Sequence, residues 1–585
     1  MYAKKMRLYP ASVKTVKGSV WGYINKEGEC AVRPTFDYTM DFQANGLSIV
    51  EKNNQYGLIN EFGKFVVQPT YQSINDFSER RAIVSTDEGY FVMDEKGKLL
   101  TTEPYQYIGM YQESRAQFSI LKDNSYFYGF LDLNGKEAIP TQYKSAYDFQ
   151  NMQAIVQLEN SFYALINQDG KVLQTYSYPY IADQGDGLVA FKKADDFEAK
   201  FGVMDLGGNV ILSPTYSGIQ PFQDGRAVVN IAEDFKNNFG LIDRKGTYII
   251  KPIYNDITML GQERVSVGKA LDEEKPYLGS RFAIATTDGM FLTDFKYDQV
   301  QHFDQGFASA NNDIQTFFIN KKGKIASELP VLRGTGSLTL EGDMIKAFID
   351  QRVSYMTRDG KIIWMQNTVI PLNRMYKVIE KKYMPNKEYL VYYPQVTGMK
   401  NEKTEKSVNE KLKELSQVKE IDATKPVEYS YTGDYDVEFF NEELLVLEIN
   451  GYEFPFGAAH GMPLKVYPHT NLRNGTFYKL KDFFKPGSEY VKVLSDIIGE
   501  QIKNDETYSY VFPDTYKWIS PDQPFYISED VLFIYFTPYD IAPYAAGFPT
   551  FTIFYSEILD IINKEGDFWK SFHQRKEGGF QGPPV

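Results

Sequence analysis

The sequence predicts an all-β repeat array of three-stranded meanders followed by an α+β domain. Three observations carry this prediction. One phrase recurs throughout the first part of the 585-residue chain, aromatic residues make up 15% of it, and apolar residues at helical spacing are clear only after about Lys387. Aromatic side chains favour strands, and a recurring phrase is typical of a repeat architecture. We expect a repeat array at 1–365, a linker at 366–386, a domain at 387–568 and a flexible tail at 569–585.

The recurring phrase reads YGLINEFGKFVVQPTY at Tyr56–Tyr71 and FGLIDRKGTYIIKPIY at Phe239–Tyr254. Asn60 and Gly63 bracket a tight turn, because Asn bonds its own backbone and Gly tolerates positive φ. Such a turn closes a β-hairpin, and the following Pro ends the return strand because it cannot donate to the ladder. A second phrase, such as FSERRAIV from Phe77, supplies another strand. Each copy therefore predicts a three-stranded antiparallel meander.

Stacking of the copies follows from their size, because a small meander cannot bury its apolar face alone. Further complete copies begin at Trp21, Tyr128 and Phe201. We expect Gly57 to let a neighbouring aromatic ring lie over bare backbone. The copies outnumber the roughly four to eight blades of a usual propeller, and they vary in length. We therefore favour an extended or superhelical array. A propeller-like array is the alternative.

These residues resemble the WG repeats of bacterial proteins, in which Trp, Tyr or Phe precedes Gly and Asn or Asp stands before a turn that ends in Gly. The resemblance covers the segment from Lys17 to Trp364. It implies a β-rich array and no known catalytic residue.

The C-terminal region follows a different pattern. The segment NTVIPLNRMYKVIEKKY from Asn367 reads as a connecting strand and linker. Apolar residues at helical spacing in EKSVNEKLKELSQVKEI and EYVKVLSDIIGEQI predict two helices. Alternating runs between and after them predict strands, and Asn474-Gly475 predicts a hairpin. Helices combined with antiparallel strands indicate an α+β domain.

Four phrases of this region carry a second resemblance: YYPQVTG, FGAAHGMP, YKLKDFF and YDIAPYAAGFP. They resemble the extracytoplasmic domain of bacterial anti-sigma factors that sense lysozyme, and the domain that accompanies the catalytic domain of a peptidoglycan deacetylase. The resemblance implies binding of a protein or a cell-wall-derived ligand, and not catalysis. This chain differs from those proteins in showing no signal peptide and no transmembrane anchor.

Composition excludes several function classes. A net charge of −14 opposes binding to nucleic acid or to an anionic membrane, and no apolar run is long enough to span a bilayer. The single cysteine, Cys30, excludes an intramolecular disulfide and a thiolate cluster, and we expect it to be a small buried residue. Absence of a signal peptide predicts a cytoplasmic protein; a cell-surface or spore-associated location is the alternative.

Candidate ligand-binding residues lie in two segments of the second module. His460 and His469 could join carboxylates in a metal or acid–base site, but two histidines without spaced acids or cysteines are no metal signature. The simpler reading is a tight turn at His460 and a solvated strand end at His469. The loop YDIAPYAAG offers Tyr539, Asp540 and Tyr544 for stacking or hydrogen bonding; alternatively these tyrosines cover the core.

No nucleophile elbow, P-loop or dinucleotide fingerprint is present in the sequence. We therefore expect no catalytic residue, cofactor or bound metal. The sequence predicts a non-enzymatic binding or scaffold protein, whose partner is a protein or a cell-wall glycan. The alternatives are an enzyme or accessory protein that acts on cell-wall glycan, and a structural or surface assembly protein.

Overall fold

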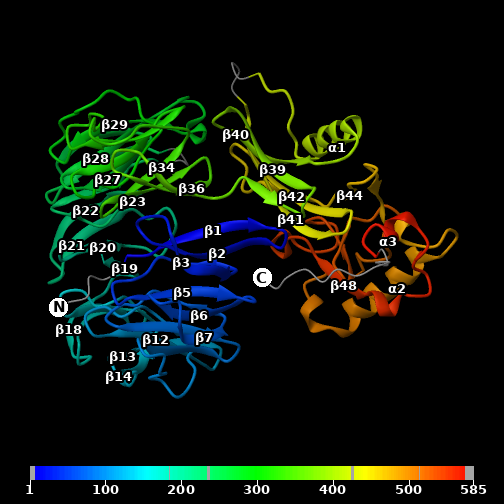
Figure 1. Ribbon diagram of the computed structural model, residues 1–585. Helices are drawn as coiled ribbons and strands as arrows, with labels where there is room; N and C mark the ends of the chain where they lie inside the picture. The colour runs from blue at the N-terminus through cyan, green and yellow to red at the C-terminus, as the bar shows by residue number, and fades with distance from the viewer. Residues whose placement is uncertain (1–6, 184, 234–236, 423–426, 513, 574–585) are drawn as a thin grey trace. The chain divides into compact units, whose positions relative to one another are not determined.

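The computed structural model describes residues 7–183, 185–233, 237–422, 427–512 and 514–573 (Figure 1). The described chain forms two compact units. Unit 1 comprises the chain up to Ser12 and Val20–Gln366, and unit 2 comprises Val13–Ser19 and the chain from Asn367 onward. No helix in the described ranges has the length and apolar character needed to cross a membrane.

Unit 1 is a succession of small antiparallel sheets, and in each sheet the strands pair in chain order. The first five sheets are β1 (Tyr9–Thr15), β2 (Gly18–Ile24), β3 (Cys30–Phe36); β4 (Tyr38–Thr39), β5 (Leu47–Lys52), β6 (Gln55–Asn60), β7 (Phe65–Tyr71); β8 (Ser73–Ile74), β9 (Arg81–Thr86), β10 (Gly89–Asp94); β11 (Tyr107–Ile108), β12 (Ala116–Lys122), β13 (Ser125–Leu131), β14 (Glu137–Tyr143); and β15 (Ser145–Ala146), β16 (Gln153–Gln157), β17 (Tyr163–Asn167), β18 (Val172–Tyr176).

The later five sheets of unit 1 follow the same plan. They are β19 (Tyr180–Asp183), β20 (Leu188–Lys192), β21 (Phe201–Asp205), β22 (Val210–Tyr216); β23 (Gly218–Ile219), β24 (Arg226–Asn230), β25 (Phe239–Asp243), β26 (Tyr248–Tyr254); β27 (Asp256–Gly261), β28 (Arg264–Ala270), β29 (Ser280–Thr286); β30 (Gln299–Val300), β31 (Phe307–Asn311), β32 (Gln315–Asn320), β33 (Leu332–Arg333); and β34 (Gly336–Glu341), β35 (Met344–Ile349), β36 (Arg352–Thr357), β37 (Ile362–Met365). The expected three-stranded meander is present in three of these described sheets, and the other seven add a fourth strand.

Neighbouring sheets share one apolar cluster, and this sharing continues around the whole of unit 1. Phe130 of the fourth sheet, for example, packs with Val156 of the fifth. The last sheet packs in the same way on the first, where Tyr355 meets Tyr9 and Ile24. The Tyr355 hydroxyl also donates to the carbonyl oxygen of Pro10 at 3.0 Å. Because the first and last sheets touch, unit 1 closes on itself, and the propeller-like alternative is favoured over the open array.

The glycine of the recurring phrase is required by the return strand. A Cβ on Gly57 would lie 2.7 Å from the carbonyl oxygen of Val67 and 2.8 Å from the nitrogen of Pro69. The pairing of β6 with β7 shifts register on both sides of Leu58, as at a β-bulge. The expectation that an aromatic ring covers Gly57 is therefore corrected: the backbone of β7 fills that space.

Arginines of the second phrase connect one sheet to the next. The Arg81 Nε donates to the Leu133 carbonyl oxygen at 2.8 Å, and the Arg264 Nε donates to the Lys321 carbonyl oxygen at 2.7 Å. Each acceptor lies in a hairpin turn of the following sheet. These bonds satisfy turn carbonyls and fix the spacing of the sheets.

Unit 2 contains a large mixed sheet and a smaller one. The large sheet is formed by β38 (Val369–Pro371), β39 (Lys377–Asn386), β40 (Tyr389–Thr397), β41 (Tyr429–Asn441), β42 (Leu444–Pro455), β43 (Met462–Val466), β44 (His469–Asn471) and β45 (Phe477–Tyr478), and the smaller by β46 (Phe525–Ile527), β47 (Val531–Tyr535) and β48 (Thr550–Phe554). The helices are α1 (Glu402–Leu415), α2 (Tyr490–Asn504) and α3 (Asp567–Lys570).

Two apolar cores hold unit 2 together. Leu412 of α1 packs on Leu447 of the large sheet. Ile498 of α2 packs with Ile534 and Phe551 of the small sheet. The expected α+β domain is thus present, with its helices against the sheets.

Three expectations about segment boundaries and Cys30 need correction. The predicted linker at 366–386 forms β38 and β39, because Val378 and its neighbours pair with β40 and enter the α1 core. In the predicted tail at 569–585, Trp569 and Phe572 pack into the α2 core, and 574–585 lies outside the described residues. Cys30 is exposed, because it stands at the first position of β3.

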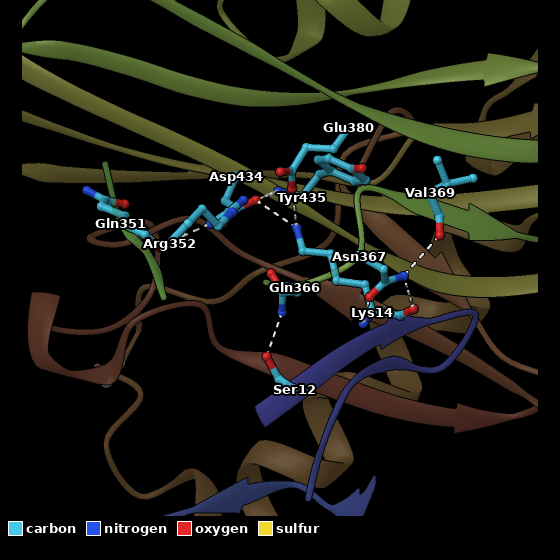
Figure 2. Close-up of polar contacts among 10 residues, drawn as sticks. All are labelled: Ser12, Lys14, Gln351, Arg352, Gln366, Asn367, Val369, Glu380, Asp434 and Tyr435. Carbon is cyan, nitrogen blue, oxygen red and sulfur yellow. Dashed lines mark hydrogen bonds and ion pairs between the residues drawn. The ribbon is translucent and has the colours of Figure 1, made fainter. Parts of the chain in front are cut away.

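A buried ion pair within unit 2 joins Lys14 to Glu380 and Asp434 of the large sheet (Figure 2). The Lys14 Nζ lies 2.9 Å from Glu380 Oε2 and 3.4 Å from Asp434 Oδ1, and the side chains of Lys14 and Glu380 are only 5% and 7% exposed. The side chain of Asn367 accepts from the Lys14 N–H at 2.8 Å and donates to its carbonyl oxygen at 3.0 Å. The hairpin tip Val13–Ser19 is therefore an integral part of unit 2.

Replacing the repeat glycine is expected to destabilise the chain. Gly57→Ala forces the backbones of β6 and β7 apart and should lower the free energy of unfolding by about 1–3 kcal/mol, measured by urea unfolding. Gly218→Ala is the matched control, because its Cβ would meet only Asn230 Cβ at an ordinary 3.6 Å. Equal midpoints for the two variants would show that the close approach at Gly57 has no energetic consequence.

Removing Lys14 is expected to destabilise unit 2. Lys14→Met removes the ammonium group from a buried ion pair with Glu380, and breaking such a pair costs about 3–5 kcal/mol. Lys17→Met, at an exposed position of the same hairpin, should change the urea-unfolding midpoint little. The double variant Lys14→Met/Glu380→Leu should recover most of the loss; a double variant as unstable as Lys14→Met would contradict this account.

Candidate ligand-binding site

The two loops singled out in the sequence meet in unit 2. The Tyr539 hydroxyl lies 3.0 Å from His460 Nε2. The rings of His460 and Tyr544 stack with their centroids 4.1 Å apart and an interplanar angle of 28°. His460, Tyr539 and Tyr544, which we call the aromatic cluster, thus come together from the turn before β43 and the loop between β47 and β48.

Geometry assigns the tautomer that the His460 ring adopts when it carries one ring hydrogen. Its Nδ1 lies 3.0 Å from the carbonyl oxygen of Gly461, and a carbonyl oxygen can only accept. Nδ1 therefore carries the hydrogen, and Nε2 accepts from the Tyr539 hydroxyl. Both ring nitrogens of His460 are engaged within the cluster.

The backbone of Gly461 anchors the aromatic cluster. The Gly461 N–H donates to the Tyr452 hydroxyl at 2.9 Å, and the Gly461 carbonyl oxygen accepts from the Tyr544 hydroxyl at 2.9 Å. A Cβ at position 461 would lie 2.3 Å from the carbonyl oxygen of Glu453. Only glycine fits, because the backbone of β42 comes too close for any side chain.

Tyr539 is held in an unusual backbone conformation, and its side chain faces solvent. Its φ is +73°, in the left-handed region that non-glycine residues rarely adopt. Its side chain is 53% exposed. Asp540, proposed from the sequence as a ligand contact, accepts at its Oδ2 from the N–H and the hydroxyl of Thr537, both at 2.8 Å. Asp540 therefore shapes the loop that presents Tyr539.

A groove of about 490 Å³ adjoins these segments. One wall is β43 and the residue after it, including Pro463 and Tyr467. The other includes Tyr535 of β47 together with Pro524 and Phe548, which lie just before β46 and β48. The Tyr535 hydroxyl donates to the Lys465 carbonyl oxygen at 3.0 Å. Tyrosine hydroxyls thus engage backbone carbonyls near both ends of β43, at Gly461 and Lys465, and this occupies positions that an added ligand strand would need.

Charged groups beside the groove are paired. Glu448 accepts from the Tyr467 hydroxyl at 2.6 Å and pairs with Lys465 Nζ at 3.0 Å. Burial alone would raise the pKa of Glu448, but the bonds from Tyr467 and Lys465 outweigh it and hold that pKa below its usual value. Burial and the Glu448 carboxylate raise the pKa of Tyr467. The result is an ionised, fully engaged Glu448.

His469 lies apart from the aromatic cluster, and both earlier interpretations of it are wrong. It is 1% exposed, in β44 between β42 and β45. Its ring stacks on Phe525 with centroids 4.1 Å apart and planes 7° apart, and neither ring nitrogen has a hydrogen-bond partner within the described chain. Burial lowers the pKa of His469 to about 3. His469 is thus a neutral core residue.

No group of three or more His, Cys, Asp or Glu within the described ranges is arranged to hold a metal ion. Sequence reasoning missed Tyr452, Gly461, Tyr467 and Tyr535. Only Gly461 left a signal, because it directly follows the singled-out His460.

Comparison with known proteins matches both modules. Residues 481–556 match the family described as a protein of unknown function (DUF3298). The WG containing repeat matches at 21–56, 56–90, 128–160, 201–233, 239–263 and 285–313. The chain carries N-terminal WG repeats and a C-terminal DUF3298 domain. No curated protein matches it.

Several solved structures are similar to parts of this chain. A DUF3298-family protein from Bacteroides fragilis NCTC 9343 is 19% identical with a TM-score of 0.26, covering 34% of this chain and 96% of its own. A DUF3298-family protein from Pseudomonas aeruginosa PAO1 is 18% identical with a TM-score of 0.25, covering 33% and 95%. BamB from Moraxella catarrhalis is 14% identical with a TM-score of 0.27, covering 49% and 94%.

The free energy of unfolding is expected to fall at low pH because His469 is buried. The unfolded chain binds a proton at His469 with a pKa near 6.5 and the folded chain with a pKa of about 3, so this residue's contribution to stability is complete above pH 6.5 and declines as the pH falls towards 3. The free-energy difference between wild type and His469→Phe should change by up to about 1.4 kcal/mol per pH unit over that window.

Urea unfolding at several pH values measures this difference. Phe525→Leu alters the same contact without a titrating group, and its difference from wild type should not vary with pH. A His469→Phe difference that is also constant would mean that the pKa of His469 is the same in the folded and unfolded chains, and it would contradict this account.

Proposed function

We propose that this chain is a non-enzymatic binding protein. Its DUF3298 domain recognises a protein or a cell-wall-derived ligand at the aromatic cluster and the adjoining groove, and its WG repeats serve as a scaffold or further interaction surface. The observation that carries the proposal is the combination of an exposed Tyr539 with a hydrogen-bonded His460 that is stacked on Tyr544.

Rigid exposed aromatic rings favour binding for two reasons. They bring a large contact area, and their few rotatable bonds lose little entropy on binding. In this site the hydrogen bonds around Gly461 already fix the rings before any ligand arrives, and such preorganisation lowers the cost of association. The groove adds apolar surface from Pro463, Pro524 and Phe548.

Catalysis of wall-glycan hydrolysis is the second candidate and fits the site less well. A general base needs a free acceptor within reach of substrate. Both ring nitrogens of His460 are occupied, and Glu448 is engaged by Tyr467 and Lys465. Turnover of peptidoglycan fragments that is lost in His460→Ala would favour the enzyme; ordered self-assembly seen by electron microscopy would favour a structural protein.

Loss of Tyr539 is expected to weaken binding. We expect the full chain to bind soluble muropeptides or lysozyme, the two probes that the resemblance implies, and Tyr539→Ala to weaken binding by about 30-fold, the effect of a central aromatic contact worth roughly 2 kcal/mol. Isothermal titration calorimetry measures the affinity.

Tyr277→Ala is the matched control, because Tyr277 is a comparably exposed tyrosine (58%) in unit 1. Its affinity should equal that of wild type. The proposal fails if wild type binds neither probe, or if Tyr277→Ala weakens binding as much as Tyr539→Ala.

A further inference from the structure

The backbone N–H and carbonyl oxygen of Gly461 are held by side chains from three separate segments. Tyr452 comes from β42, His460 from the turn before β43, and Tyr544 from the loop after β47. We propose that Tyr452 and Tyr544 are positioning residues of the binding site. Through Gly461 they set the tautomer and orientation of His460, and through His460 they fix Tyr539. This inference rests on the proposed function, which it deepens.

The backbone N–H and the backbone carbonyl oxygen of Gly461 both have partners. Its N–H donates to the Tyr452 hydroxyl, and its carbonyl oxygen accepts both from the Tyr544 hydroxyl and from His460 Nδ1. A carbonyl oxygen has two lone pairs, so these two donors fill it. The N–H and the carbonyl oxygen of Gly461 belong to two consecutive peptide groups, so rotation of the first breaks one hydrogen bond and rotation of the second breaks two. The space for a Cβ is closed by Glu453.

The fixed carbonyl oxygen decides the state of the imidazole. The opposite tautomer would place the Nδ1 lone pair against a carbonyl lone pair at 3.0 Å, which is repulsive. The proton is thus held on Nδ1, and the Nε2 lone pair is left to accept from the Tyr539 hydroxyl. This bond links the exposed ring of Tyr539, whose backbone is strained at φ +73°, to the buried peptide of Gly461.

The stacking of Tyr544 on His460 also restrains the orientation of the His460 ring plane. Tyr544 bonds to Gly461 through its hydroxyl and stacks on His460 through its ring face. Tyr544 thus acts on His460 twice, through the shared acceptor and through direct contact. Tyr452 acts through the Gly461 N–H and through a side-chain hydrogen bond to Tyr544. Removal of its hydroxyl therefore tests both links and leaves the Tyr544 ring on His460 in place.

The test reads the His460 tautomer by NMR in the full chain labelled with 15N-histidine, with the His460 signals assigned from a His460→Gln variant. Wild type should show the Nδ1–H tautomer. Tyr452→Phe and Tyr544→Phe each remove one hydroxyl and should shift the ring towards a mixture containing the Nε2–H tautomer. Tyr510→Phe, which removes a hydroxyl outside the cluster in the same unit, should leave the signals unchanged.

Affinity for muropeptides and for lysozyme is measured on the same variants. Tyr452→Phe and Tyr544→Phe should each weaken binding of the probe that wild type binds by about tenfold, while Tyr510→Phe should not. Urea-unfolding midpoints confirm that the variants remain folded; an unfolded Tyr544→Phe leaves Tyr452→Phe as the deciding variant.

The outcomes separate this inference from the function on which it rests. An Nε2–H tautomer in wild type, or unchanged His460 signals in both Phe variants, overturns the positioning role even where the chain binds. A shifted tautomer with full affinity also overturns it. Failure of wild type to bind either probe overturns the proposed function, and with it the binding role of Tyr452 and Tyr544, while the tautomer still reports whether Gly461 orients His460.

Discussion

A sheet of a few short strands cannot cover its own apolar faces, and the architecture of the WG array follows from this constraint. In β5, Ile49 packs in the cluster shared with the third sheet, while the next residue, Val50, packs in the cluster shared with the first. Both faces of each sheet are buried, so its central strands read as continuous apolar runs. Closure of the array satisfies the same requirement for the first and last sheets, through Tyr9 and Tyr355.

In the DUF3298 domain, tyrosine hydroxyls perform a comparable structural task at the backbone. Tyr535 of the small sheet binds the carbonyl oxygen of Lys465 in β43, and Tyr544 of the loop after β47 binds that of Gly461, just before β43. These bonds satisfy carbonyls that strand pairing leaves open. The same bonds hold the groove and the aromatic cluster in fixed positions relative to each other. The tyrosines that stabilise the fold therefore also orient the proposed binding surface.

Much of this architecture could be predicted from local sequence. The Asn60 side chain accepts from the N–H groups of Phe62 and Lys64 and Gly63 has a φ of +71°, as the turn pattern predicts. Local patterns failed where distant segments decide: they gave no hint that β7 crowds Gly57, that β38 and β39 join the large sheet, or that Phe525 covers His469. Of the candidate site, His460, Tyr539 and Tyr544 could be singled out as unusual loop residues, but their contacts with each other and with Tyr452 depend on tertiary packing.

The central claim is that ligand recognition takes place on the DUF3298 domain, at the aromatic cluster and its groove. Hydrogen–deuterium exchange of the full chain with and without a saturating probe, muropeptide or lysozyme, tests it most directly. The account predicts added protection in residues 452–467 and 535–548, which form the two walls of the site. Binding that protects only the WG repeats, or another face of the DUF3298 domain, would contradict it.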